Sequence, residues 1–193
     1  MDIIETANEL CDYLKQFPAI RSCRIYGSLH SNTHDNYSDI DIEIDVSGHD
    51  NSLFLTRIPA RLSQTYNIIF CDYAPSLVPE KHLLTVALFD SNPFMVVDVS
   101  CTATPYFSTL SRPELAAYNT PYDHTLKLFI ANLKHYLRQS NCHDDIVKMY
   151  RRIFAAPSRS DAQMLTDVFH WLKQHAQPKH INYLSACEAY LQF

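Results

Sequence analysis

The clearest pattern along the chain is the strict alternation of acidic and apolar residues in DIDIEIDV, residues 39–46. Successive side chains of a β-strand point to opposite faces of the sheet, so this segment predicts a strand with its isoleucines buried on one face. The opposite face then presents four carboxylates, those of Asp39, Asp41, Glu43 and Asp45. Further strand-like runs occupy residues 19–26, 66–73, 83–89 and 94–101. The turn-forming residues DSNP between the last two runs predict a β-hairpin.

Helical spacing of apolar residues dominates the rest of the chain. It predicts a helix over residues 2–16 and another within 51–64. After about Pro105 the strand-like runs fade, and four helical segments follow at residues 122–139, 143–156, 160–176 and 179–193, with caps or breaks at Asn141, Pro157, Ser160 and Pro178. We therefore expect an α+β fold, α/β-like in its first part. A mixed sheet with flanking helices (1–104) would precede a C-terminal helical bundle (105–193).

Composition limits the classes of protein without naming a function. With 193 residues, 47% of them hydrophobic and 19% charged, the chain is ordinary for a folded globular protein. The formal net charge of -5 disfavours nucleic acid as the main partner without excluding it. Six scattered cysteines, an acidic N-terminus and the lack of a long apolar run predict a cytoplasmic protein with reduced thiols and no membrane contact.

Gly27, one of only two glycines in the chain, follows the strand-like run CRIY and precedes Ser28. Glycine permits a tight turn and a close approach of the backbone to a phosphate, and the N–H groups of a helix opened by Ser28 bind anions. Asp39 and Asp41 lie two residues apart on one strand face and supply oxygen ligands for a hard cation. Taken alone, the acidic alternation is typical of a solvated surface strand; the upstream turn favours a nucleotide site.

The residues YGS, separated by ten residues from DIDI, resemble the signature of the DNA polymerase β-like nucleotidyltransferase superfamily. That signature is an apolar residue, glycine, glycine or serine, a short spacer, and two acidic residues alternating with apolar ones. The resemblance covers residues 25–101. It implies a nucleotidyltransferase core, two Mg²⁺ ions, and transfer of a nucleoside monophosphate from a triphosphate such as ATP to a hydroxyl group. The helical half matches only in kind, because many members append a helical domain that closes over the nucleotide.

The superfamily also has a third acidic residue on a later strand, and Asp98 is the matching candidate. It is the lone charge in FMVVDVSC, and the hairpin that contains it is similar to that of aminoglycoside adenylyltransferases. A structural role at the strand end is the competing interpretation of Asp98. Asp72 is the alternative third carboxylate, although its position near Pro75 predicts a turn residue. The resemblance thus implies a catalytic and metal-binding set of Asp39, Asp41 and Asp98.

Basic residues recur at helical spacing in residues 122–139, at Lys127, Lys134 and Arg138. They fit the solvated face of an amphipathic helix. If the helix instead faces the cleft, Lys127 or Lys134 would contact the triphosphate. We take Gly27, Ser28 and Lys127 as the predicted nucleotide-binding residues.

The predicted function is therefore Mg²⁺-dependent nucleotidyl transfer to a hydroxyl-bearing acceptor. A small antibiotic of the aminoglycoside or lincosamide type is the first hypothesis, since an acidic protein attracts a cationic drug, and antibiotic resistance is the corresponding role. Transfer to a protein or an RNA, as in toxin–antitoxin nucleotidyltransferases, is the alternative. A catalytically silent nucleotide-binding module is a third. The sequence leaves the acceptor, the nucleotide and the oligomeric state open.

Overall fold

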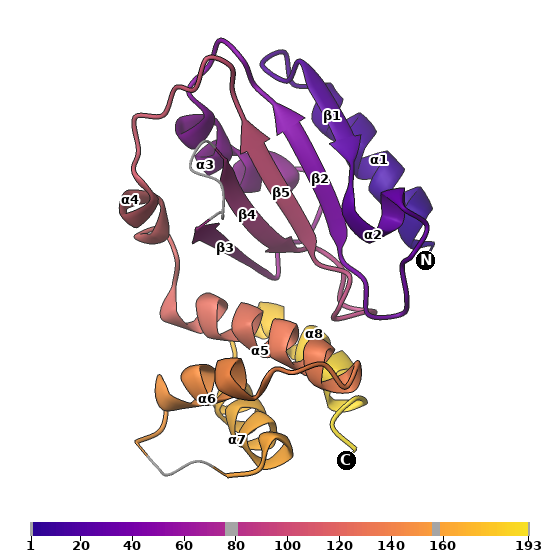
Figure 1. Cartoon of the computed structure of the whole chain (residues 1–193), viewed down its shortest axis with the longest axis vertical. Coiled ribbons are helices and arrows are strands. Elements are labelled where there is room, and N and C mark those ends of the chain that lie inside the picture. The colour runs from indigo at the N-terminus through magenta and orange to yellow at the C-terminus, as the bar shows by residue number, and fades with distance from the viewer. Residues whose placement is uncertain (1, 76–80, 156–158, 193) are drawn as a thin grey trace.

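The computed structural model describes residues 2–75, 81–155 and 159–192. Figure 1 shows one mixed sheet with helices behind it, and a group of helices that lies beyond one end of the strands. The predicted α+β class is confirmed. None of the described helices combines the length and the apolar character that crossing a membrane requires.

The sheet half contains α1 (Ile3–Lys15), β1 (Ser22–Ile25), α2 (Gly27–His30), β2 (Ile40–Asp45), α3 (Asn51–Leu62), β3 (Phe70–Pro75), β4 (His82–Ala87) and β5 (Val97–Thr102). The helical half contains α4 (Arg112–Ala116), α5 (Pro121–Leu137), α6 (His143–Arg151), α7 (Asp161–Gln174), the 3₁₀ helix η1 (Pro178–His180) and α8 (Ile181–Glu188). The five strands are ordered β1-β2-β5-β4-β3. The β2–β5 pair is parallel and the other pairs are antiparallel.

The acidic alternation of β2 has the predicted effect on burial. Ile40, Ile42 and Ile44 are fully buried, whereas the acidic residues between them are only partly buried on the opposite face. The isoleucine face packs with residues of α1 and α3 into the first hydrophobic core. The carboxylate face is therefore the one left for a site.

The second hydrophobic core joins the helical half to the sheet half. It contains residues of α5, α6, α7 and α8 together with Phe70, Phe94 and Val96. Because these three come from the sheet half, the helices pack directly against it. The division at residue 105 falls between β5 and α4 and remains a prediction.

Element boundaries differ from the prediction mainly where a helix begins or ends. The short helix α4 was not predicted; Ser111 and Glu114 form a capping box at its start. Pro178 lies at the predicted boundary between α7 and the last helical segment, where it opens η1. Ser160 caps α7 as predicted. The predicted break at Pro157 lies outside the described residues.

Candidate active site

A row of polar residues crosses four adjacent strands. Asp41 of β2 is the register partner of Asp98 of β5. Thr85 of β4 is opposite Asp98, and Asp72 of β3 is opposite Thr85. Register partners project from the same face of a sheet, so these side chains share the carboxylate face. We call Asp41, Asp98, Thr85 and Asp72 the polar row.

Asp98 is held in the polar row by Thr85, whose Oγ1 donates a hydrogen bond of 2.5 Å to the carboxylate. Burial raises the pKa of Asp98, the Thr85 hydrogen bond opposes this, and the charge of Asp39 raises the pKa further. The register places Asp98 beside Asp41, as the hairpin pattern predicts. Its catalytic role remains a prediction.

Gly27 lies directly against the Asp41 side chain. Its φ is +66°, and a Cβ added there would stand 2.1 Å from Asp41 Oδ2. The backbone N–H of Tyr26 also donates to the Asp41 carbonyl, at 3.0 Å. The glycine is therefore required twice, by its left-handed backbone and by the carboxylate that occupies the space of a side chain.

The pKa of Asp41 shows most directly how the carboxylates of the site affect one another. Burial, then the charges of Asp39 and Asp98, raise its pKa to about 7, against a smaller opposing effect of Lys134. Three carboxylates are thus close enough to repel one another. The protein supplies too little positive charge of its own to offset that repulsion at Asp41.

Asp39, immediately before β2, is paired across the molecule with α5. Lys134 Nζ lies 2.5 Å from Asp39 Oδ2, with side chains that are 13% and 23% exposed. A small cavity of about 60 Å³ lies beside this pair; its lining includes Asp39, Thr85, Asp98, Lys127 and Lys134. Helix α5 therefore faces the carboxylates, so Lys134 does not lie on a solvated helix face; its contact with a triphosphate remains a prediction.

Lys127 lines the same cavity, but its ammonium group is bound to Asp72. Lys127 Nζ lies 2.7 Å from Asp72 Oδ1, and His124 Nδ1 lies 2.8 Å from Oδ2. The prediction that Asp72 is a turn residue is wrong, because Asp72 lies within β3 and is fully buried. Two strands, β4 and β5, separate Asp72 from Asp41. Asp98, not Asp72, is therefore the carboxylate adjacent to Asp41.

The loop between α2 and β2 is fixed by Arg138, the C-cap residue of α5. The Arg138 guanidinium donates from Nε to Asp35 at 2.9 Å and from a second nitrogen at 2.5 Å. These hydrogen bonds hold the pKa of Asp35 well below its usual range. Ser28 lies at the other end of this segment, in the first turn of α2, where no side chain caps the helix.

A second polar group lies one step further along the carboxylate face. Glu43 forms ion pairs with Arg24 and with Lys81. Burial alone would raise the pKa of Glu43, but the hydrogen bonds from these two cations outweigh it and lower the pKa. Glu43 is therefore neutralised within the protein, which agrees with its absence from the predicted catalytic set.

The carboxylates suit a hard divalent cation in their chemistry, since oxygen ligands are what Mg²⁺ prefers. In this conformation Asp39 contacts Lys134, Asp41 faces Gly27, and Asp98 binds Thr85. Within the described residues, no three or more His, Cys, Asp or Glu side chains gather around one point. The three carboxylates therefore supply the type of donor that such an ion prefers, but among the described residues they do not converge on one point.

No family model matches the sequence, and no curated protein matches it. The structure resembles a chain of the GLD-2/RNP-8 complex, with 13% sequence identity and a TM-score of 0.41 over 88% of this chain and 77% of that chain. It also resembles a chain of the poly(A) polymerase complex of GLD-2 with GLD-3, with 16% identity and a TM-score of 0.38. That match covers 91% of this chain and about half, 54%, of the other. Both resemblances are distant and assign no activity to this chain.

Proposed function

We propose that this protein is a nucleotidyltransferase that transfers a nucleoside monophosphate from a triphosphate to a hydroxyl group. ATP is the triphosphate that we propose. The observation that carries the proposal is the packing of Gly27 against Asp41, with Asp98 beside Asp41 on the next strand. The left-handed turn at Gly27 and a set of carboxylates whose repulsion at Asp41 is not fully offset by Lys134 are thereby brought together. This is the arrangement that the DNA polymerase β-like resemblance implies.

Asp39, Asp41 and Asp98 would hold Mg²⁺. When bound, the metal would neutralise charge on the leaving pyrophosphate and lower the pKa of the attacking hydroxyl. The raised pKa of Asp41 supports this assignment, because a divalent cation would relieve the repulsion that burial and two neighbouring carboxylates create.

The protein's own groups have distinct tasks in this proposal. Gly27 and the first N–H groups of α2, with the Ser28 hydroxyl, bind triphosphate oxygens. Asp98 is a partly buried carboxylate whose pKa is raised, which makes it a stronger base toward the acceptor hydroxyl. Lys134, once its place at Asp39 is taken by a cation, supplies positive charge to the triphosphate.

Lys127 has a weaker claim to the triphosphate than Lys134. Its ammonium group is paired with the buried Asp72. If Lys127 moved to the triphosphate, the Asp72 carboxylate would lose this partner at a place that water does not reach. We retain Lys127 as a residue at the edge of the nucleotide site. Its main effect there would be to fix α5 against β3.

For the acceptor we propose a small hydroxyl-bearing molecule. The carboxylate face gives little support to a cationic antibiotic in particular, because Glu43 is already paired with Arg24 and Lys81. An RNA end or a protein hydroxyl are the alternatives, and the same active-site chemistry would serve each of them. The acceptor must therefore be found by experiment.

The test of the proposal is calorimetric titration of a non-hydrolysable ATP analogue with and without Mg²⁺. We expect binding that requires Mg²⁺ in the wild type and is lost in Asp41→Asn. Glu43→Gln is the matched control on the same strand face, and it should bind as the wild type does. Binding that ignores both Mg²⁺ and Asp41 would refute the assignment. A second assay, with ATP in place of the analogue, tests for a catalytically silent module, which would bind ATP without releasing pyrophosphate.

A further inference from the structure

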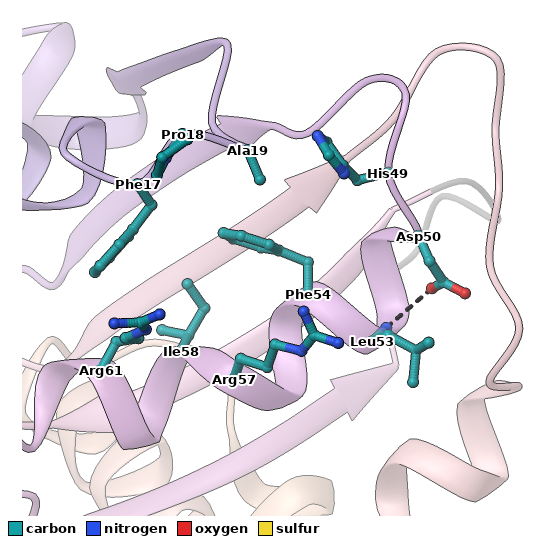
Figure 2. A pocket seen from close by; sticks show the side chains of 10 residues that line it. All are labelled: Phe17, Pro18, Ala19, His49, Asp50, Leu53, Phe54, Arg57, Ile58 and Arg61. Atoms are coloured by element: carbon teal, nitrogen blue, oxygen red, sulfur yellow. Dashed lines mark hydrogen bonds between the residues drawn. The ribbon is translucent and has the colours of Figure 1, made fainter.

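A larger cavity lies on the other side of the sheet, away from the polar row. Its volume is about 490 Å³, within the range of about 300–1,000 Å³ that small-molecule sites occupy. It is formed by α3 and by the loops that precede β1 and α3, and Figure 2 shows its lining. The lining residues are Phe17, Pro18, Ala19, His49, Asp50, Leu53, Phe54, Arg57, Ile58 and Arg61. We call this space the α3 cavity.

The walls of the α3 cavity are largely apolar and aromatic. The side chains of Phe17 and Phe54 extend from different segments toward the same space, and Ile58 lies between them (Figure 2). Phe17 and Phe54 are only partly buried, so their rings remain accessible. Such walls suit a flat apolar body that contacts both rings.

Two cations line the same cavity. Arg57 and Arg61 are exposed and lie one helical turn apart on α3, so they project from one face of the helix. Among the described residues neither has a carboxylate partner; the Arg61 guanidinium lies instead 5.6 Å from the centre of the Phe17 ring. Within the part of the chain that the structure describes, these two positive charges therefore have no carboxylate counterion, in a chain of net charge -5.

The acidic residue of the lining does not neutralise these arginines. Asp50 Oδ1 accepts a hydrogen bond from the Leu53 N–H at 2.9 Å and caps α3. Its Oδ2 accepts from the N–H and the hydroxyl of Thr109, at 2.9 and 2.5 Å. Both oxygens of Asp50 are thus engaged by α3 and by the segment before α4, and the guanidinium groups remain available to a ligand.

We propose that the α3 cavity binds a small organic anion, a flat apolar body that carries one carboxylate or one phosphate monoester. The rings of Phe17 and Phe54 contact the body, and the guanidinium groups of Arg57 and Arg61 bind the anion with the fork geometry that suits both acids. The sheet lies between the α3 cavity and the candidate active site. It does not depend on the proposed nucleotidyl transfer.

The test uses three naphthalene probes of the same shape: 2-naphthoate, 2-naphthyl phosphate and the uncharged 2-naphthamide. Calorimetric titration should show that at least one anionic probe binds the wild type at least tenfold more tightly than the amide. The variant Arg57→Gln/Arg61→Gln should lose at least tenfold in affinity for that anionic probe while its affinity for the amide is unchanged. Arg151→Gln, a change at an exposed arginine of α6, is the control and should bind as the wild type does.

Which anionic probe binds decides between a carboxylate and a phosphate ligand. Phe54→Ala should weaken all three probes, because it removes part of the apolar wall that they share. The proposal is overturned if the charged and uncharged probes bind alike, if the double arginine variant retains the affinity for the anion, or if no probe binds at millimolar concentration. Melting temperatures of the variants, all at partly or fully exposed positions, check that they are folded.

Discussion

Asp41 and Asp98 are register partners on β2 and β5, the only parallel pair of strands among the described residues. Burial is the largest cause that raises the pKa of each, and the charge of Asp39 raises both further. Apolar residues at these two positions would oppose folding less, because both carboxylates are partly buried and repel one another. The energetic cost of the pair is what makes it a candidate for chemistry.

The first prediction concerns the pH dependence of stability. The pKa of Asp41 is about 7 in the folded protein, against 3.8 for an ordinary aspartate. Between these values the folded protein retains a proton that the unfolded chain has lost, so the free energy of unfolding falls as pH rises and becomes level above about pH 7. The Asp41→Asn variant has no carboxylate at this position, so its free energy of unfolding does not fall in this way. We expect its melting temperature to exceed that of the wild type by several degrees at pH 8, and the difference to vanish near pH 4.

Asp39→Asn is the matched comparison for this measurement. It removes the ion pair with Lys134, so it should not raise the melting temperature at pH 8. Mg²⁺ should stabilise the wild type at pH 8 and have little effect on Asp41→Asn, because a ligand stabilises only the state that binds it. A difference between Asp41→Asn and wild type that is the same at every pH would contradict the assigned pKa.

The second prediction concerns Gly27. A Cβ would meet Asp41 Oδ2 at 2.1 Å, so Gly27→Ala must displace the carboxylate as well as strain the backbone. We expect a loss of stability of about 1 kcal/mol or more and a large loss of Mg²⁺-dependent nucleotide binding. Gly48→Ala is the control, since Gly48 also has a positive φ, of +92°, but lies next to Arg21. It should lose stability and keep nucleotide binding; equal effects of the two variants on binding would contradict a special role for Gly27.

The third prediction separates the two lysines of α5. Lys127→Met leaves the fully buried Asp72 with only His124 beside it, so we expect destabilisation of the order of 3 kcal/mol in urea unfolding. Lys134→Met should be milder, because Asp39 is 23% exposed and can be hydrated. Adding Asp72→Asn to Lys127→Met should recover much of the stability. If that double variant is stable but binds nucleotide weakly, Lys127 contacts the triphosphate directly.

Much of the site follows from local sequence. The alternation in β2 fixes which face carries Asp39 and Asp41, and the turn residues between residues 89 and 94 fix the hairpin that returns Asp98 to the sheet. Both signals are short-range, because strand period and turn chemistry are properties of neighbouring residues.

What the sequence could not provide is the pairing of distant charges. Asp72 resembled a turn residue near Pro75, and its burial becomes intelligible only through Lys127 and His124, more than fifty positions later in the chain. The contact between Lys134 and Asp39 is of the same kind. Helix α4 was missed for another reason, since its five residues are too few for a periodic pattern; only the capping residues Ser111 and Glu114 could have indicated it.

The most direct test of the account follows the α-phosphate of ATP. Labelled ATP and Mg²⁺ would be incubated with a panel of acceptors that includes aminoglycosides, lincosamides, RNA and proteins, and label transfer would be measured together with pyrophosphate release. We predict that wild type transfers label to one acceptor class and releases one pyrophosphate per transfer, while Asp98→Asn loses activity by orders of magnitude and Glu43→Gln does not. Near-normal transfer by Asp98→Asn would contradict the central claim.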